Sequence, residues 1–182
     1  MNFSAKIFLM LDLVFSAEGG SPPKDGSASG MTPIGGKNNI FKKSPSEKFF
    51  REILNAGIKE LKIKDKNIEV SLNLVGEDKI KALNKKYRGK NNDTDVLSFP
   101  LKESRLKKYD ILPLGDIFIC LPFAVKESKR QNIGLEKELA WLTVHGFLHL
   151  LGYDHEKSKQ GAEKMFKLES RILSKLNSYL KS

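Results

Sequence analysis

All three histidines of this 182-residue chain lie within one eleven-residue stretch, as His145, His149 and His155. In a helix, residues four apart lie on one face about 6 Å from each other, so His145 and His149 can bind the same metal ion. Gly152 can adopt the left-handed backbone that ends a helix, after which the chain can turn back and bring His155 to the same point. Three protein ligands leave the fourth position of a tetrahedral zinc ion to water, as in catalytic sites.

Two other interpretations of the histidines stay open. A single histidine on an apolar helix is usually a hydrogen-bonded core residue. A structural zinc site needs a fourth ligand, commonly cysteine, but the single cysteine of the chain, Cys120, lies in an apolar run. Asp116 or Asp154 would then have to complete the site. The clustering of all three histidines favours a catalytic metal site. One Zn²⁺ ion per chain is expected, with another divalent metal as the alternative.

The composition is that of one globular domain with a basic surface. A length of 182 residues with 40% hydrophobic content allows a single packed core. Residues 1–40 carry three lysines and three acidic residues, so the whole net charge of +10 lies on residues 41–182. Such a domain attracts polyanions, nucleic acid first among them, although a solvated lysine-rich surface has the same composition. A single cysteine excludes an internal disulfide and is compatible with a reducing compartment.

The first thirty-six residues have the pattern of a flexible appendage. The apolar run at residues 7–15 is too short to span a bilayer and makes a poor signal peptide. Twelve of the twenty residues from Ala17 to Gly36 are glycine, proline or serine, which is typical of a flexible linker. We therefore expect an appendage at residues 1–36, one domain at residues 37–182, and no membrane partner.

Hydrophobic periodicity predicts an α+β domain in which helices cover a small sheet of about four strands. Strands are expected at residues 39–42, 69–75, 95–100 and 115–120. Helices are expected from a capping box at residues 44–47, from 80 to Gly89, from Pro122 to about Gln131, and from 135 to 151. A last amphipathic helix carries the apolar residues Ala162, Met165, Phe166, Ile172, Leu173, Leu176 and Leu180. The helix from 135 to 151 is apolar almost all round, so we expect it to be buried.

The spacing H-x-x-x-H-x-x-G-x-x-H is similar to that of the metzincin metalloproteases, with one departure. Those proteases carry glutamate directly after the first histidine, where it is the general base. In this chain that position is Gly146, so peptide hydrolysis lacks its usual base. A metal ion can instead activate water and polarise a phosphoryl oxygen, while a cationic side chain stabilises the charge of the transition state. The pattern therefore favours phosphodiester hydrolysis over proteolysis.

Three segments together resemble the YbeY family of bacterial endoribonucleases. They are His-Gly-Phe-Leu-His-Leu-Leu-Gly-Tyr-Asp-His at 145–155, Tyr-Arg-Gly-Lys at 87–90 followed by Thr-Asp-Val-Leu-Ser-Phe-Pro at 94–100, and Leu-Gly-Asp-Ile at 114–117. Their order and spacing fit the family over about residues 38–182. The eleven-residue metal motif is highly specific, whereas the Gly-Asp-Ile block alone would be weak.

The resemblance implies a small mixed sheet packed with helices, related to the zincin-like proteases, and zinc held by His145, His149 and His155. It further implies that Arg88 is essential and that the substrate is single-stranded RNA. The implied role is ribosomal RNA processing and ribosome quality control in the cytoplasm, with the ribosome or its small-subunit components as partner. One departure is Asp93, where the family usually carries proline. The amino-terminal segment lies outside the family pattern.

Four further side chains are candidates for the site. Arg88 is the expected catalytic residue, because a guanidinium binds phosphate through two parallel hydrogen bonds, although it could simply neutralise a helix end. Asp95 and Asp116 are candidates for RNA binding or for orienting arginine, with turn and cap roles equally compatible. Asp154 is a candidate acceptor behind a metal ligand.

The expected function is that of a metal-dependent, single-strand-specific endoribonuclease in ribosome maturation. Two alternatives stay open. One is a non-catalytic, zinc-containing ribosome assembly factor, and the other, less favoured, is a metalloprotease. The sequence does not identify the general base.

Overall fold

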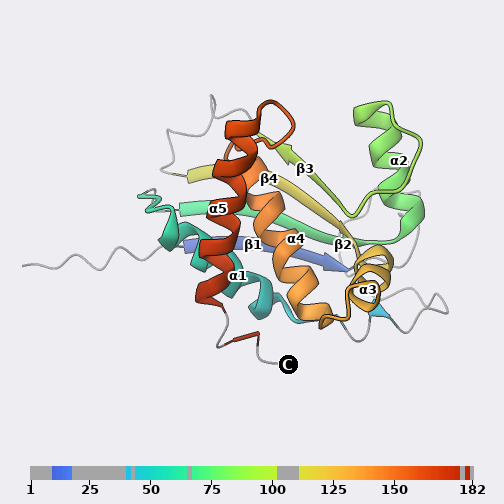
Figure 1. Cartoon of the computed structure of the whole chain (residues 1–182), viewed down its shortest axis with the longest axis horizontal. Helices are drawn as coiled ribbons and strands as arrows, with labels where there is room; N and C mark the ends of the chain where they lie inside the picture. The colour runs from blue at the N-terminus through green and yellow to red at the C-terminus, as the bar shows by residue number, and fades with distance from the viewer. Residues whose placement is uncertain are drawn as a thin grey trace, which may run out of the picture.

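The computed structural model describes residues 10–17, 40–41, 44–64, 67–101, 111–176 and 179–180. Strands and helices alternate along the chain as far as Arg88, two consecutive strands follow, and consecutive helices come last (Figure 1). In chain order the elements are β1 (Met10–Ala17), α1 (Glu47–Glu60), β2 (Asn67–Val75), α2 (Glu77–Arg88), β3 (Val96–Pro100), β4 (Ile111–Cys120), α3 (Leu121–Arg130), α4 (Leu135–Leu150) and α5 (Lys159–Lys175).

The four strands form one mixed sheet in the order β1-β2-β4-β3. Strands β1 and β4 both pair with β2 in parallel, and β3 pairs with β4 in antiparallel orientation at the edge. Parallel neighbours need a crossover connection, and α1 lies in the chain between β1 and β2. The expected α+β fold with a small mixed sheet is confirmed.

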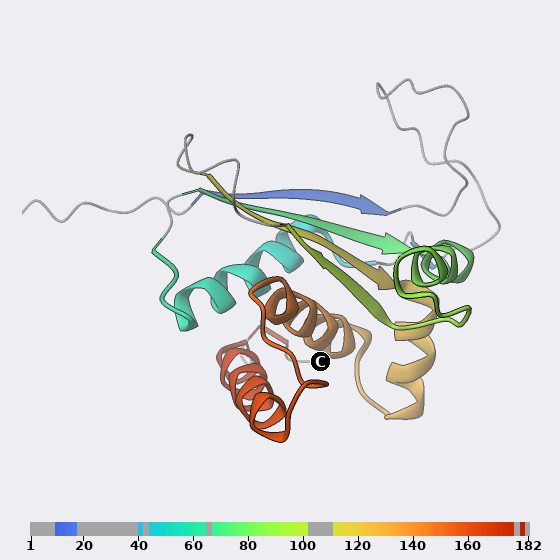
Figure 2. The same cartoon turned by 90° about the horizontal axis from the view of Figure 1, so that it is seen from above.

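Helices α1, α4 and α5 lie together on one side of the sheet (Figure 2). Helix α4 is the central one, and it contacts β3, β4, α1, α3 and α5. Its buried residues lie all around the helix, as its apolar sequence predicts. The main core lies between these helices and the sheet, and its largest fully buried side chains include Phe50, Ile53, Leu72, Ile117 and Phe147. A smaller cluster of Val75, Ile80, Leu97 and Cys120 anchors α2.

Several expected boundaries agree with the structure. Helix α2 ends at Gly89, whose φ of 69° is the left-handed conformation of a helix C-cap. Helix α3 begins one residue before the predicted Pro122, and α4 begins at Leu135. Among the described residues, no helix combines the length and hydrophobicity needed to cross a bilayer.

Two expectations near the amino terminus are wrong. A strand was expected at residues 39–42, but Ile40 and Phe41 lie in a turn. The fourth strand is instead β1, which lies within the segment that we expected to be flexible. Leu11, Leu13 and Phe15 occupy every second position, which is the pattern of a strand. The charged Asp12 interrupts the apolar run and makes this pattern harder to recognise. Residues 1–9 and 18–36 lie outside the described part of the chain.

The capping box was also misplaced. Helix α1 begins at Glu47 with Ser46 as its N-cap, and the Ser46 side chain makes no capping hydrogen bond. The Ser44 hydroxyl instead donates to the Phe41 carbonyl at 2.8 Å. Ser44 therefore stabilises the turn that precedes the helix. Serine side chains often bond to nearby backbone in this way, in competition with capping a helix.

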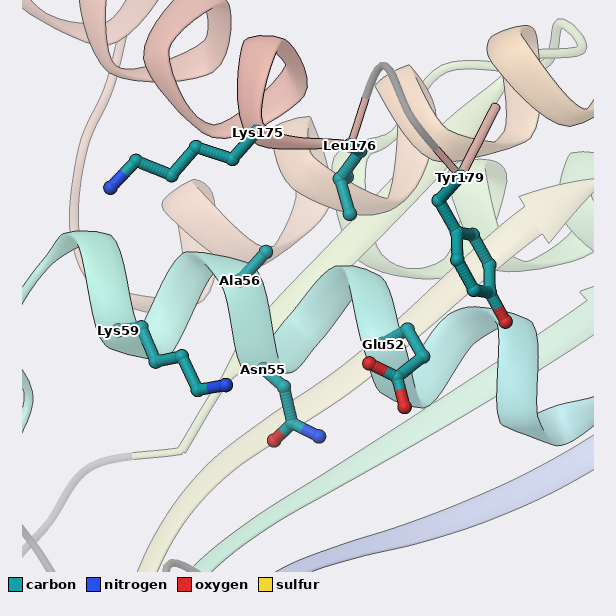
Figure 3. Close-up of a pocket in the computed structure, with 7 residues that line it drawn as sticks. All are labelled: Glu52, Asn55, Ala56, Lys59, Lys175, Leu176 and Tyr179. Atoms are coloured by element: carbon teal, nitrogen blue, oxygen red, sulfur yellow. The ribbon is translucent and has the colours of Figure 1, made fainter. Parts of the chain in front are cut away.

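A hollow of about 300 Å³ lies between α1 and the end of α5 (Figure 3). Its lining mixes charged and apolar side chains: Glu52, Asn55, Ala56, Lys59, Lys175, Leu176 and Tyr179. None of the three histidines lines this hollow.

The close approach of α1 to α4 generates a prediction about stability. A Cβ atom at Gly57 would lie 2.8 Å from Cε1 of Phe147, whose ring is fully buried. Overpacking costs about 1–3 kcal/mol, whereas replacing helical glycine by alanine gains about 0.5–1 kcal/mol. We therefore expect Gly57→Ala to lower the free energy of unfolding by about 1 kcal/mol in urea titrations. The cost should shrink in a Phe147→Leu background, and a Gly57→Ala protein as stable as the parent would contradict the packing argument.

Candidate metal centre

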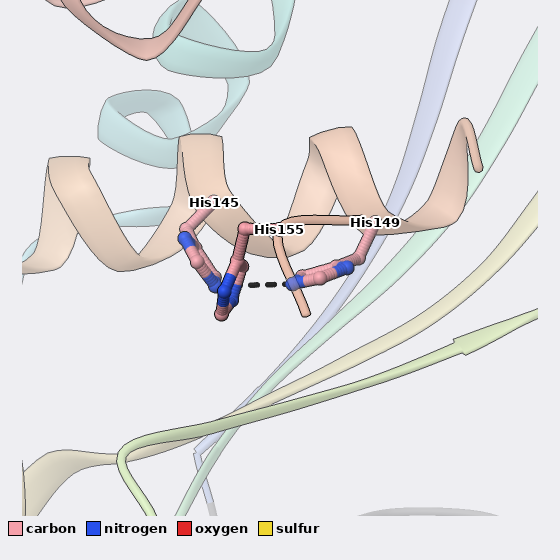
Figure 4. Close-up of side chains that lie close together, drawn as sticks. All are labelled: His145, His149 and His155. Atoms are coloured by element: carbon pink, nitrogen blue, oxygen red, sulfur yellow. Dashed lines mark hydrogen bonds between the residues drawn. The ribbon is translucent and has the colours of Figure 1, made fainter. Parts of the chain in front are cut away.

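The three histidines converge on one point beside α4 (Figure 4). The Nε2 atoms of His145 and His149 are 3.1 Å apart, and one ring nitrogen from each of the three histidines lies within 4.8 Å of the others. Tetrahedral zinc with Zn–N bonds of about 2.05 Å would separate its nitrogen ligands by about 3.4 Å. The cluster therefore fits a divalent metal ion with only small side-chain shifts.

The loop that returns His155 to the helix is built by the end of α4. Gly152 has a φ of 85°, and the N–H groups of Gly152 and Tyr153 donate to the carbonyls of His149 and Leu148, each at 3.0 Å. This pair of bonds is a Schellman motif, which reverses the chain after a helix. The expected role of Gly152 is confirmed.

Glu169 is a site residue that sequence reasoning missed. Its Oε1 atom lies 2.7 Å from Nδ1 of His145, and the two residues are 3% and 8% exposed. A carboxylate accepts only, so Nδ1 carries the proton and Nε2 of His145 keeps its lone pair for a metal. The sequence pattern that could have indicated this role is the position of Glu169, a charged residue on the same buried face of α5 as Met165 and Ile172.

The environment of His149 favours its neutral form. Burial lowers the pKa of His149, and the neighbouring imidazoles of His145 and His155 lower it further. A neutral imidazole is the form that binds metal. The site therefore presents a ligand that needs little deprotonation near pH 7.

Gly146 allows α4 to lie directly against the sheet. A Cβ atom at this position would lie 2.9 Å from Cγ2 of Ile117 and 3.0 Å from the hydroxyl of Ser98. Ser98 also donates a hydrogen bond to the Gly146 carbonyl at 3.1 Å, which ties the helix to β3. The sheet thus occupies the space into which a side chain at this position would project, including the glutamate that metzincins carry there.

No fourth protein ligand completes the cluster among the described residues. Burial raises the pKa of Cys120 to about 11, which disfavours the thiolate that metal binding requires. Asp116 lies in β4 next to Ile117, and adjacent strand residues face opposite sides of the sheet, so Asp116 points away from α4. Within the part of the chain that the structure describes, the structural-zinc interpretation therefore lacks a fourth ligand.

Asp154 and Asp95 both shape local backbone. Asp154 accepts from the backbone N–H of Glu156 at 2.8 Å and pairs with Lys157 at 3.2 Å, and these two contacts lower its pKa. Asp95 accepts from the backbone N–H of Val96 at 2.8 Å, at the start of β3. Asp154 therefore stabilises the loop that carries His155, and Asp95 stabilises the start of an edge strand.

Arg88 lies close to the histidine loop. Its Nη2 atom is 3.5 Å from Oε1 of Glu156, the residue after His155, and the Arg88 side chain is 39% exposed. This contact brings the end of α2 to the rim of the cluster, although the two segments are far apart in the chain. An exposed ion pair of this length is weak, so a stronger anion can replace the carboxylate.

The fold and the site define an α+β domain in which one buried helix and the loop after it form a three-histidine cluster beside a mixed sheet. The YbeY family, described as endoribonuclease YbeY, matches residues 35–177. Relatives with that description include proteins from a Sulfurihydrogenibium species and from Persephonella marina, each 40% identical over 137 residues, which cover 75% of this chain and 88% of the relative.

A relative from Acinetobacter baumannii with the same description is 41% identical over 129 residues, covering 70% of this chain and 81% of the relative. A solution structure from Thermotoga maritima superimposes with a TM-score of 0.51 and 31% identity, over 75% of this chain and 89% of that protein. The chain belongs to the YbeY endoribonuclease family, and it is an enzyme of the hydrolase class.

The Glu169–His145 pair predicts an effect on metal affinity. Glu169→Gln keeps the shape and one acceptor oxygen but removes the charge that makes His145 a better ligand. We expect zinc to bind about 10- to 100-fold more weakly, as is typical when such a supporting group is changed. Competition with a chromophoric chelator measures the dissociation constant, and circular dichroism checks the fold. Unchanged affinity in a folded variant would mean that the carboxylate does not support the site.

Proposed function

We propose that this chain is a zinc-dependent endoribonuclease that cleaves single-stranded segments of ribosomal RNA during ribosome maturation, with His145, His149 and His155 as metal ligands. The observation that carries the proposal is the convergence of three imidazoles within 4.8 Å, with no fourth protein ligand among the described residues. A bound divalent ion would supply Lewis-acid chemistry and water activation at that point. Membership of an endoribonuclease family supports RNA as the substrate.

The protein side chains have separate tasks in this proposal. Glu169 holds the proton on Nδ1 of His145, so that Nε2 faces the centre. Arg88 exchanges its carboxylate partner, Glu156, for a phosphate of the RNA and stabilises the negative charge that grows during cleavage. The guanidinium suits this task because it presents several N–H donors in a fixed plane.

The basic surface supports an RNA substrate and the ribosome as partner. The net charge of +10 lies outside the first forty residues and favours long-range attraction of a polyanion. A ribosomal substrate also places the enzyme in the cytoplasm. The single cysteine, Cys120, is free and buried, which fits a reducing compartment.

The alternative left open by the sequence, an RNA-binding assembly factor without catalysis, would have the same charge and the same metal cluster, but membership of an endoribonuclease family favours the enzyme. The two candidates differ in what Arg88 does. In the enzyme it acts on the reacting phosphate, whereas in an assembly factor it contributes only to affinity. A protease is not favoured, because the sheet fills the space beside Gly146.

Replacing Arg88 therefore separates these functions. We expect Arg88→Ala to reduce the rate of single-stranded RNA cleavage by about 10²–10³-fold, the usual cost of losing one transition-state donor. Arg88→Lys should recover only part of the rate, because lysine lacks the planar fork. Cleavage is followed on denaturing gels with zinc-loaded full-length protein.

The matched control is Arg130→Ala, which removes an exposed arginine that pairs with Glu127 on α3. This variant should cleave like the parent protein. Equal cleavage by the Arg88→Ala protein would remove Arg88 from the mechanism. Absence of cleavage by the parent protein, with RNA binding retained, would favour the assembly factor.

A further inference from the structure

Two aromatic rings near the histidine cluster are unusually exposed. Phe166 is 50% exposed and Tyr87 is 57% exposed, although most large apolar side chains of the domain are buried. We expected Phe166 to belong to the apolar face of α5, but only its neighbour Met165 enters the core. A single exposed apolar side chain is common on protein surfaces, so what distinguishes these two rings is their support by the residues beside the histidine cluster and Arg88.

Phe166 forms part of the wall of the histidine cluster. Its ring stacks on the ring of His155, with centroids 6.2 Å apart and an interplanar angle of 22°. The rings of His145 and His149 lie 5.1 and 5.3 Å from His155 on centroids. Phe166 is therefore held in place by a residue of the cluster while half of its surface stays accessible.

Tyr87 is held in a comparable way at the end of α2. Its ring packs on Phe99 of β3 at 4.9 Å between centroids, and Phe99 packs on Phe118 of β4 at 5.8 Å. The ammonium group of Lys86 lies 5.0 Å from the centroid of the Tyr87 ring. Tyr87 is thus a supported and exposed ring beside a cation.

One chain of contacts joins the two rings. Tyr87 precedes Arg88, whose guanidinium lies 3.5 Å from Glu156. Glu156 follows His155, and His155 stacks on Phe166. Tyr87 and Phe166 therefore lie at the two ends of a connected set of residues. Arg88, the candidate for binding phosphate, and the histidine cluster lie between them.

We propose that Phe166 and Tyr87 are base-stacking platforms, on which unpaired bases of the RNA lie while the backbone between them passes Arg88 and the histidines. This inference rests on the proposed function and adds two binding subsites to it. Proteins that bind single strands combine cations along the backbone with aromatic side chains under the bases. The exposed lysines Lys86, Lys90, Lys164 and Lys167 lie next to the two rings in the chain and supply the cations.

Stacking platforms also give a physical reason for acting on single strands. In a duplex both faces of a base are covered by neighbouring bases, so an aromatic side chain can stack only on bases that are unpaired or at an end. A phosphate-only site would bind duplex and single strand through the same charges. Platforms beside the reacting phosphate would therefore select flexible RNA segments.

The test measures the binding of an unpaired oligonucleotide to the zinc-loaded full chain. The probe is a fluorescent 2′-O-methyl oligoribonucleotide of about ten nucleotides, checked on a gel for integrity. Phe166→Leu and Tyr87→Leu keep apolar volume but remove the aromatic face, and each should weaken binding about 5- to 100-fold. Phe166→Trp and Tyr87→Phe should bind within about twofold of the parent protein.

Two controls separate stacking from other effects. Tyr179 is 46% exposed but lines the hollow beside α1, so Tyr179→Leu should leave the affinity unchanged. An abasic oligonucleotide of the same length keeps the phosphates, so the parent and both leucine variants should bind it equally. Because Phe166 touches His155, zinc content is measured for each variant; if it falls in Phe166→Leu, Tyr87→Leu decides the outcome.

Leucine variants that bind the normal oligonucleotide like the parent would overturn the platforms. So would a loss of affinity that is equally large for the abasic strand, because it would reflect phosphate contacts. If the parent protein does not bind single-stranded RNA at all, the platforms are overturned together with the proposed function, whereas loss of the leucine effects alone overturns only the platforms.

Discussion

The histidine cluster depends on a buried hydrogen bond between a carboxylate and an imidazole, at the contact of α4 with α5. Glu169 and His145 meet at 2.7 Å and are almost fully buried, and Met165 and Ile172, which flank Glu169 on α5, belong to the main core. Burying such a pair costs desolvation energy that its mutual attraction repays only with good geometry, so an apolar pair would stabilise the fold at least as well. The hydrogen bond instead orients the imidazole of His145, because it fixes which ring nitrogen faces the other two histidines.

The packing of α4 on the sheet determines where the oriented imidazole of His145 lies in the fold. Gly146 lets the helix approach Ile117 and Ser98 at contact distance, and the Schellman motif at Gly152 turns the chain back over the same helix face. The cluster therefore lies at the surface end of an otherwise buried helix, where a ligand can reach it. Arg88 is the last residue of α2, so the site depends on the tertiary fold, although its three histidines lie close together in the sequence.

Local patterns predicted much of this arrangement. The spacing of the histidines, Gly152 and the apolar sequence of α4 were sufficient to infer a metal-binding helix. The sequence also located the C-terminal ends of α2 and α3 within about one residue, whereas α2 begins three residues before the expected position 80. Glu169 was missed because its partner is 24 residues away and only the packing of α5 brings them together. Strand β1 was missed because Asp12 interrupts a short apolar run, and pairing with β2 is a long-range contact. The exposure of Phe166 could not be seen in a helical pattern that places apolar residues on one face.

The proposed activity requires that the three imidazoles bind one divalent ion and leave a coordination position open. X-ray absorption spectroscopy of the zinc-loaded chain, combined with elemental analysis, measures this directly. We expect one ion per chain, bound by three imidazole nitrogens and at least one light ligand from water. A sulfur ligand, a fourth protein side chain on the ion, or failure of the folded chain to bind metal would contradict it.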